Sequence, residues 1–407
     1  MNPRLGFGKI NRMSQYDMNN HDFSLTPDVA SKFGCGRFRM EEHLLERCAE
    51  EVLRFGRKPL FVCNDTTYEI GYEKVAGSLR AEGVEPKVLK YNGFCCRETA
   101  LDLALKGAVD GIDMVIGCGG GVVLDFSKCL ADIAGVPLVT MPTSSATCCA
   151  FTPIAPCYTP EGRYISTSFF RREIAAALLD LTILAKQPSR LLVAGACDAM
   201  AKKIEMEFWN TLPGAVGNPV ACGIASLIAD YMYADLDRKL GAAVEDLRKG
   251  EPTQTLKDVI FSAVVGAGVV SGISGGARQT ALAHWVYFFL RERYTAKAVK
   301  YTHGELVAIG LVLQLAYYGR MGDARAFAAR LRGWGLAASM GDLGIPFGDD
   351  DVAAFMEYMC RTDEMKAAGE SAVPRLREAL KAIEQGPIRL IQSWCRGSSS
   401  ASWCGWR

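Results

Sequence analysis

Histidine is scarce in this chain, which has four histidines among 407 residues but 15 cysteines. No two cysteines form a C-x-x-C pair, so the sequence gives no indication of a zinc ribbon or of a thioredoxin-type motif. The N-terminal stretch lacks the apolar region of a signal peptide. We therefore expect a cytoplasmic protein with reduced thiols, in which any metal site has few histidines available.

The chain also lacks a marked excess of either charge, since its formal net charge is +1. Nucleic-acid-binding proteins usually carry a basic surplus, so we expect no nucleic-acid partner. One uncharged run, 259–277, is rich in glycine and serine and has no flanking aromatic anchors. We expect this run to form core helices rather than a membrane span.

At 407 residues the chain is long enough for two domains. Short apolar runs at 59–63, 87–91, 114–116 and 136–141 alternate with helical patterns at 72–82, 98–108 and 123–134. Such repeated β-α units predict a parallel sheet with helices on both faces. Beyond about residue 185 the patterns are long and helical, at 188–209, 218–236 and 305–318. We predict an α/β domain over residues 1–185 and an all-helical domain over residues 186–407.

A glycine-rich loop, Gly117-Cys-Gly-Gly-Gly121, follows the run 114–116 and precedes a helical pattern. Glycines let the backbone approach a phosphate closely, and a helix N-terminus offers free N–H groups to it. A tight turn without a ligand would also fit this position, but it does not need three consecutive glycines. We therefore favour a phosphate site at Gly119, Gly120 and Gly121.

Asp65 comes directly after the first apolar run of the α/β pattern. A carboxylate at this place in a dinucleotide-binding fold commonly bonds a ribose hydroxyl and repels a 2′-phosphate. An aspartate after a strand is equally often a turn residue or a helix cap. If Asp65 binds ribose, it favours NAD(H) over NADP(H).

One carboxylate and two histidines lie at positions where the apolar pattern predicts burial. Asp198 lies on the apolar face of a helical pattern, His284 lies on another, and His303 directly precedes an apolar helix. Each alone is explained by a hydrogen-bonded core residue. Together, one carboxylate and two imidazoles would suit a divalent cation with an open coordination position. Spacing along the chain does not show whether the three converge.

In combination, these segments resemble the iron-containing (group III) alcohol dehydrogenases, which have the dehydroquinate-synthase-like fold. The resemblance runs from about residue 33 to 320 and is carried by motifs in the family's order. These motifs are Gly119-Gly-Gly121 with Asp125 and Lys128, Met141-Pro-Thr143-Ser-Ser-Ala-Thr147, Tyr158-Thr-Pro-Glu-Gly162, Pro188-Ser-Arg190, Gly195-Ala-Cys-Asp198, Ala283-His284 and His303-Gly-Glu305. Such an ordered series is far more specific than any single motif.

The resemblance implies a dinucleotide-binding N-terminal domain, a helical metal-binding C-terminal domain and an active site in the cleft between them. It implies that Asp198, His284 and His303 are catalytic and hold Zn²⁺ or Fe²⁺, which polarises the substrate oxygen while hydride moves to or from nicotinamide. The residues expected to bind the cofactor are Asp65, Gly119, Gly120, Gly121, Val122, Val123, Thr143, Thr152, Ile154 and Tyr158. Because relatives commonly assemble, we also expect a homo-oligomer.

Two departures from the family pattern bear on the substrate. Glycerol dehydrogenases have a polyol-binding aspartate where this chain has Cys148, and a cysteine neither accepts a diol's hydrogen bonds as a carboxylate does nor repels an anion. This version resembles the hydroxycarboxylate dehydrogenase branch, which reduces small 2-oxo acids. Tyr287 replaces the second histidine of H-x-x-H-N-G, so we expect a bulkier and drier pocket. Arg278 is a candidate for binding a carboxylate, although a surface or helix-capping role is the preferred explanation.

We predict a metal-dependent oxidoreductase that transfers hydride between NAD(P)(H) and a small hydroxy acid, 2-oxo acid or alcohol, with Cys148 beside the substrate. A glycerol-type polyol dehydrogenase is the first alternative. A dehydroquinate-synthase-like lyase is another; Lys202 and Lys203 follow Asp198, but the other pocket segments are apolar. An inactive cofactor-binding scaffold is the last, and the retention of all three ligand types argues against it.

Overall fold

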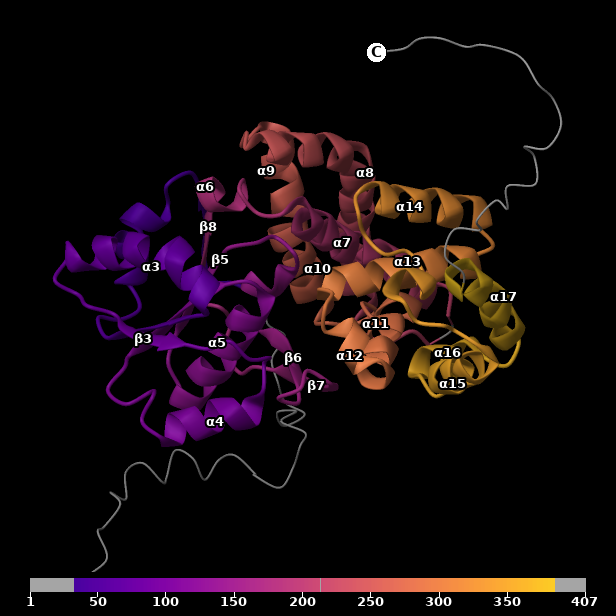
Figure 1. Cartoon of the computed structure of the whole chain (residues 1–407), viewed down its shortest axis with the longest axis horizontal. Helices are drawn as coiled ribbons and strands as arrows, with labels where there is room; N and C mark the ends of the chain where they lie inside the picture. The colour runs from indigo at the N-terminus through magenta and orange to yellow at the C-terminus, as the bar shows by residue number, and fades with distance from the viewer. Residues whose placement is uncertain (1–32, 213, 385–407) are drawn as a thin grey trace, which may run out of the picture.

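The computed structural model describes residues 33–212 and 214–384. The α/β part forms one side of the molecule and the helical part the other (Figure 1). The main sheet has six parallel strands in the order β1-β8-β5-β4-β2-β3. The strands are β1 (Phe38–Glu41), β2 (Pro59–Cys63), β3 (Lys87–Lys90), β4 (Met114–Gly119), β5 (Leu138–Pro142) and β8 (Ala176–Asp180). The predicted fold class is confirmed.

Helices cover both faces of this sheet. They are η1 (Leu45–Arg47), α2 (Ala49–Val52), α3 (Asp65–Arg80), α4 (Arg97–Leu105) and α5 (Gly121–Ala134). The fully buried strand β2 shows why two faces are needed, because successive strand side chains point in opposite directions. Phe61 and Cys63 pack with residues of α3, whereas Leu60 and Val62 pack with residues of α4 and α5.

The strand order places a topological switch between β2 and β4. The chain leaves β2 towards the edge strand β3, but it leaves β4 in the opposite direction, towards β5. In parallel sheets, ligands bind outside the carboxyl ends of the strands at such a point. Asp65 follows β2 and the glycine loop ends β4, so both predicted cofactor segments lie at this edge of the sheet.

Helices make up the rest of the described chain after β8. They are α6 (Leu181–Leu184), α7 (Ser189–Asn210), α8 (Pro219–Lys249), α9 (Gln254–Phe261), α10 (Ala267–Ser274), α11 (Leu282–Arg293), α12 (Thr295–Ala298), α13 (His303–Tyr317), α14 (Met321–Gly333), η4 (Gly341–Leu343), α15 (Asp349–Cys360), α16 (Asp363–Ala368) and α17 (Ala372–Glu384). We propose a domain boundary between residues 185 and 186, in the connection from α6 to α7.

Glycines allow α7, α11 and α13 to cross closely. A Cβ atom at Gly304, in the first turn of α13, would overlap the carbonyl of Ala194 on α7. A Cβ at Gly310, farther along α13, would overlap the carbonyl of Ala283 on α11. Because His303 and His284 are next in sequence to Gly304 and Ala283, these crossings fix the positions of both histidines.

The structure differs from the sequence prediction in several elements. α3 begins at Asp65 because Asn64 and Thr67 form a capping box, whereas the apolar pattern alone placed the start at residue 72. Strands β1 and β8 were missed, as was the separate antiparallel hairpin of β6 (Ile154–Tyr158) and β7 (Tyr164–Phe169). The sequence of β8, AALLD, has no alternation, and β1 contains polar residues because it is an edge strand.

Residues 259–274 of the uncharged run lie in one continuous helix, Gln254–Ser274, which includes a π-helical turn at Ser262–Gly266. By length and composition this helix could cross a membrane, but 67% of its most apolar window is buried in the protein. It packs against α8 and α7. It is therefore a core helix, as the sequence predicted.

Candidate metal centre and cofactor site

Three helices bring Asp198, His284 and His303 together. Asp198 lies in the middle of α7, His284 in the first turn of α11, and His303 at the start of α13. The Asp198 Oδ1 atom is 3.6 Å from His284 Nε2 and 3.4 Å from His303 Nε2. The two Nε2 atoms are 3.3 Å apart. The convergence that sequence spacing left open is therefore present.

These three side chains have the features of a metal site. Asp198 is 3% exposed, and its Oδ1 atom has no hydrogen-bond partner among the described residues. A buried carboxylate oxygen without a donor is costly. Burial raises the pKa of Asp198, but His303 and His284 outweigh it and hold this pKa well below its usual value. One oxygen and two nitrogens facing a common point fit Zn²⁺ or Fe²⁺ with an open position.

Glu205 orients His284, and the sequence analysis missed it. Its Oε2 atom lies 2.5 Å from His284 Nδ1, and its Oε1 atom accepts hydrogen bonds from the backbone N–H groups of Ala281 and His284. A carboxylate only accepts, so Nδ1 carries a proton and Nε2 is the ring nitrogen directed towards Asp198. The available signal was spacing, because Glu205 lies two turns after Asp198 on the same side of α7.

The pKa values of the two histidines differ. For His284, burial lowers the pKa, but the charge of Glu205 outweighs it and raises the value to about 9. For His303, burial dominates and lowers the pKa. A cation must therefore displace a proton from His284 to bind there.

Aromatic side chains line one side of the cluster. The ring of Tyr287 meets the ring of His303 edge to face, with centroids 4.3 Å apart. The hydroxyl of Tyr287 is hydrogen-bonded to that of Tyr158 on β6, and both residues are buried. The guanidinium of Arg291 lies 4.6 Å from the centroid of Tyr158. Tyr287 therefore places a buried aromatic ring against His303.

The glycine loop has two kinds of glycine. A Cβ at Gly117 or Gly119 would collide with Ser127 or Val123 of α5, so packing explains these two. At Gly120 and Gly121 a Cβ would meet no atom closer than 3.7 Å, and neither residue has a positive φ. Neither packing nor backbone strain requires glycine there. Among the described residues, no side chain caps the N-terminus of α5 at Gly120, so the N–H groups of its first turn are uncapped.

The other residues expected to bind the cofactor range from exposed to buried. Thr143 lies beside the loop, since its N–H donates to the carbonyl of Gly119 at 3.0 Å. Val122 is exposed. The side chain of Val123 is buried against Gly119, so only the backbone of Val123 can face a phosphate. Asp65 is exposed and bonds Asn92 Nδ2 at 2.8 Å.

On β6 and the loop before it, the expected residues are mostly buried. Thr152 is buried, with its hydroxyl 3.4 Å from the carbonyl of Cys148. The carbonyl of Ile154 accepts a hydrogen bond from Lys128, which also bonds Asp125. Cys148 is buried in the short helix η2 (Cys148–Ala150), and burial raises the pKa of its thiol.

Arg278 is not oriented to bind a substrate. Its guanidinium donates to the carbonyls of Val216 and Ala215 and to Asn210 Oδ1. These contacts anchor a surface loop, which agrees with the preferred explanation from the sequence.

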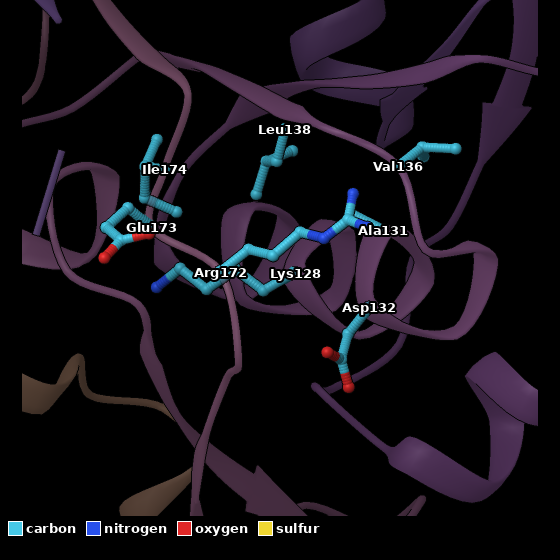
Figure 2. A pocket seen from close by; sticks show the side chains of 8 residues that line it. All are labelled: Lys128, Ala131, Asp132, Val136, Leu138, Arg172, Glu173 and Ile174. Carbon is cyan, nitrogen blue, oxygen red and sulfur yellow. The ribbon is translucent and has the colours of Figure 1, made fainter. Parts of the chain in front are cut away.

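A small hollow elsewhere on the α/β part is distinct from this site. Figure 2 shows Arg172 and Glu173, which precede β8, facing Lys128, Ala131 and Asp132 of α5. It lies along the later turns of α5, away from the glycine loop at the start of that helix.

Comparison with known proteins supports the resemblance seen in the sequence. Residues 35–180 match the model of the iron-containing alcohol dehydrogenase family. Hydroxycarboxylate dehydrogenase A of Escherichia coli (strain K12) is 30% identical over 236 residues, which cover 58% of this chain and 63% of that protein. Glycerol dehydrogenase of Thermotoga maritima is 27% identical over 341 residues, covering 81% of this chain and 89% of the relative.

Solved structures show a similar fold. The crystal structure of a probable glycerol dehydrogenase from Sinorhizobium meliloti 1021 is similar, with a TM-score of 0.73 and 23% identity. The similarity covers 87% of this chain and 98% of that one, and it shows that the fold is shared. The family model matches the sheet-forming part of the chain, and the similarity to the glycerol dehydrogenase of Thermotoga maritima extends over most of its length.

Proposed function

We propose that the protein is a metal-dependent oxidoreductase that transfers hydride between NAD(H) and a small 2-oxo or 2-hydroxy acid. The observation that carries the proposal is the convergence of Asp198, His284 and His303, with an orphaned buried oxygen on Asp198. The relatives named above include a hydroxycarboxylate dehydrogenase and a glycerol dehydrogenase.

In the proposed reaction, the metal ligands, Glu205 and Tyr287 would have separate roles. A divalent metal held by Asp198, His284 and His303 would supply Lewis-acid polarisation of the substrate oxygen. Glu205 would hold Nε2 of His284 directed at that position, where metal binding displaces its proton, and the buried ring of Tyr287 would shield it from water. A bound dihydronicotinamide would supply hydride to the carbonyl carbon, and the carbonyl oxygen would take up a proton from solvent. The products are the oxidised cofactor and a 2-hydroxy acid.

The glycine loop and Asp65 would bind the cofactor. The small residues Gly120 and Gly121 beside uncapped N–H groups suit a pyrophosphate. Asp65 lies at the switch point, where its carboxylate would bond a ribose hydroxyl and repel a 2′-phosphate. We expect Asp65→Gly to shift the kcat/KM ratio towards NADPH, and an unchanged ratio would remove this role.

Cys148 supports an acid rather than a polyol as substrate. Because burial raises the pKa of its thiol, Cys148 is neutral and does not repel a carboxylate. A glycerol-type activity remains the second candidate, favoured by the similarity to a glycerol dehydrogenase.

A comparison of substrates by NADH absorbance tests the proposal. The metal-loaded enzyme is assayed with a series of 2-oxo acids in one direction and with glycerol and 1,2-diols in the other. Turnover of a 2-oxo acid is expected. Turnover of polyols alone would establish the second candidate, and no turnover of either class would contradict both.

We further propose a cytoplasmic homo-oligomer with a small-molecule substrate and neither nucleic-acid nor membrane partners. Support for assembly comes from α8, whose outer face carries four exposed apolar side chains. They are Val220, Ile224, Leu227 and Tyr231, spaced at three or four residues.

A further inference from the structure

Lys202 is a buried cation to which the described residues offer no hydrogen-bond or ion-pair partner, one helical turn after Asp198 on α7. It is 6% exposed, and within the described parts of the chain its ammonium makes no hydrogen bond or ion pair. Two other lysines show the usual pattern. Lys128 is also buried but bonds Asp125 Oδ1 at 2.7 Å, and Lys203 bonds Glu207 Oε2 at 2.6 Å. A buried ammonium normally needs such a partner.

Lys202 lies beside the metal cluster. Residues four apart on a helix share a face, which places Lys202 next to Asp198. Its charge lowers the pKa values of Asp198, His284 and His303. It also acts on the thiol of Cys148, the residue expected beside the substrate. The ammonium is therefore within electrostatic reach of both the cluster and Cys148.

The nearby carboxylates are already engaged. Glu205 accepts from the N–H groups of Ala281 and His284 and is bonded to the His284 ring. Asp198 faces the two histidines. Burial lowers the pKa of Lys202, but Asp198 outweighs it and raises this pKa, so the side chain is charged.

Charge balance then requires an anion. A divalent cation and Lys202 together outweigh the two carboxylates of Asp198 and Glu205, which leaves excess positive charge in a buried place. Burying unpaired charge is unfavourable, so the site is complementary to an anionic substrate. In a 2-oxo acid the carboxylate is attached directly to the carbonyl carbon. A carbonyl directed at the metal cluster therefore brings the carboxylate within reach of an adjacent, flexible lysine.

We propose that Lys202 binds the substrate carboxylate and selects 2-oxo and 2-hydroxy acids over diols. This inference rests on the proposed function for the position of the carbonyl group. Both Lys202 and Cys148 favour an anionic substrate, because the Lys202 ammonium attracts an anion and the neutral Cys148 thiol does not repel it.

The test uses a matched pair of substrates and a matched pair of variants. The substrates are 2-oxobutanoate and 1-hydroxy-2-butanone, which differ by a carboxylate in place of a hydroxymethyl group. The variants are Lys202→Met and its control Lys203→Met, with Lys202→Arg to restore charge. Metal content and melting temperature are measured for each. Calorimetry of the metal-loaded enzyme with NADH then measures binding of oxamate, an unreactive 2-oxo acid analogue, and of inorganic phosphate.

The expected result is a fall of about 100-fold or more in the kcat/KM ratio of oxo acid to hydroxyketone for Lys202→Met. Oxamate binding is lost in this variant, is partly restored in Lys202→Arg and is unchanged in Lys203→Met. Unchanged oxamate binding in Lys202→Met, an equal loss on both substrates, or binding of phosphate in place of oxamate by the wild type would overturn the proposal.

Failure of the proposed function gives a different result. If the wild type binds oxamate through Lys202 but turns over neither substrate, the anion site stands and the proposed reaction does not. If it turns over only the hydroxyketone and does not bind oxamate, the oxidoreductase stands and the role of Lys202 does not.

Discussion

Glu205 shows how a single buried carboxylate serves both fold and site. It accepts from two backbone N–H groups at the start of α11 and from the ring of His284 on the same helix. The helix start and the direction of the metal-facing nitrogen are thereby fixed by one side chain. Removing its charge should weaken the metal site without removing a ligand.

We expect Glu205→Gln to lower metal affinity by about 10–100-fold, because a neutral amide holds the Nδ1 proton less strongly. The control is Glu207→Gln on the same helix, where the carboxylate is partly exposed and pairs with Lys203. Metal content after dialysis against graded chelator measures the difference. Equal retention of metal by both variants would remove the orienting role of Glu205.

At the scale of single residues, sequence reasoning found the potential ligands but not their contacts. Asp198 and His284 were identified because polar groups on apolar faces need partners. Their convergence depends on how three helices cross, which no spacing along the chain states. Glu205 was missed for the same reason, since its partners lie 76 and 79 positions away. Lys202 was noticed, but its lack of a partner is a property of the fold.

The helix crossings determine the geometry of the site at the scale of elements. α13 approaches α7 at Gly304 and α11 at Gly310, in each case against a backbone carbonyl that cannot move aside. Each glycine is therefore required by close approach. An added methyl group would separate helices that carry two of the three expected ligands.

Gly304→Ala should destabilise the protein by about 1–3 kcal/mol and reduce bound metal, since it displaces His303 from α7. Gly322→Ala on α14 is the control, because a Cβ there meets no atom within 4 Å. That change should be neutral or stabilise by up to about 1 kcal/mol. Thermal unfolding and metal content report the two effects, and an equally stable, metal-loaded Gly304→Ala would refute the packing argument.

Glu364, in the first turn of α16, predicts a pH dependence of stability. Burial raises its pKa from 4.5 to about 7 in the folded protein. The folded protein therefore keeps the proton on Glu364 to a higher pH than the unfolded chain does. The free energy of unfolding accordingly falls as pH rises from about 4.5 to 7. We expect Glu364→Gln to raise the melting temperature at about pH 8 and to have a shrinking effect as pH falls towards 4.5. A difference independent of pH would show that Glu364 is not the cause.

Elements with strong local signals were predicted well, and those set by distant pairing were not. The glycine loop and the buried run 59–63 identified β4, α5 and β2. In contrast, β1 is a strand because it pairs with β8, more than a hundred residues later in the chain. Tertiary contacts rather than local pattern decide such segments.

At the scale of the whole molecule, the outer face of α8 is the feature that a monomer does not explain. Leu227 and Tyr231 are each 71% exposed, although both are large and apolar. Their inner neighbours Ala225 and Ala229 are buried in the core. A second copy of the chain would cover this stripe.

We expect Leu227→Glu to reduce the molecular mass in solution, because it places a charge in the covered face. Lys249→Glu, at the exposed end of the same helix, should leave the mass unchanged. Light scattering after size exclusion measures both. A wild type that is monomeric at all concentrations would contradict the proposed assembly.

The central claim, metal-dependent hydride transfer at Asp198, His284 and His303, is tested most directly by titrating metal into chelator-treated enzyme while following NADH oxidation with a 2-oxo acid. We predict that the rate rises in proportion to bound Zn²⁺ or Fe²⁺ and stops rising at one ion per chain, and that Asp198→Asn stays inactive throughout. An enzyme that is fully active without metal, or an Asp198→Asn variant that matches the wild type, would contradict the account.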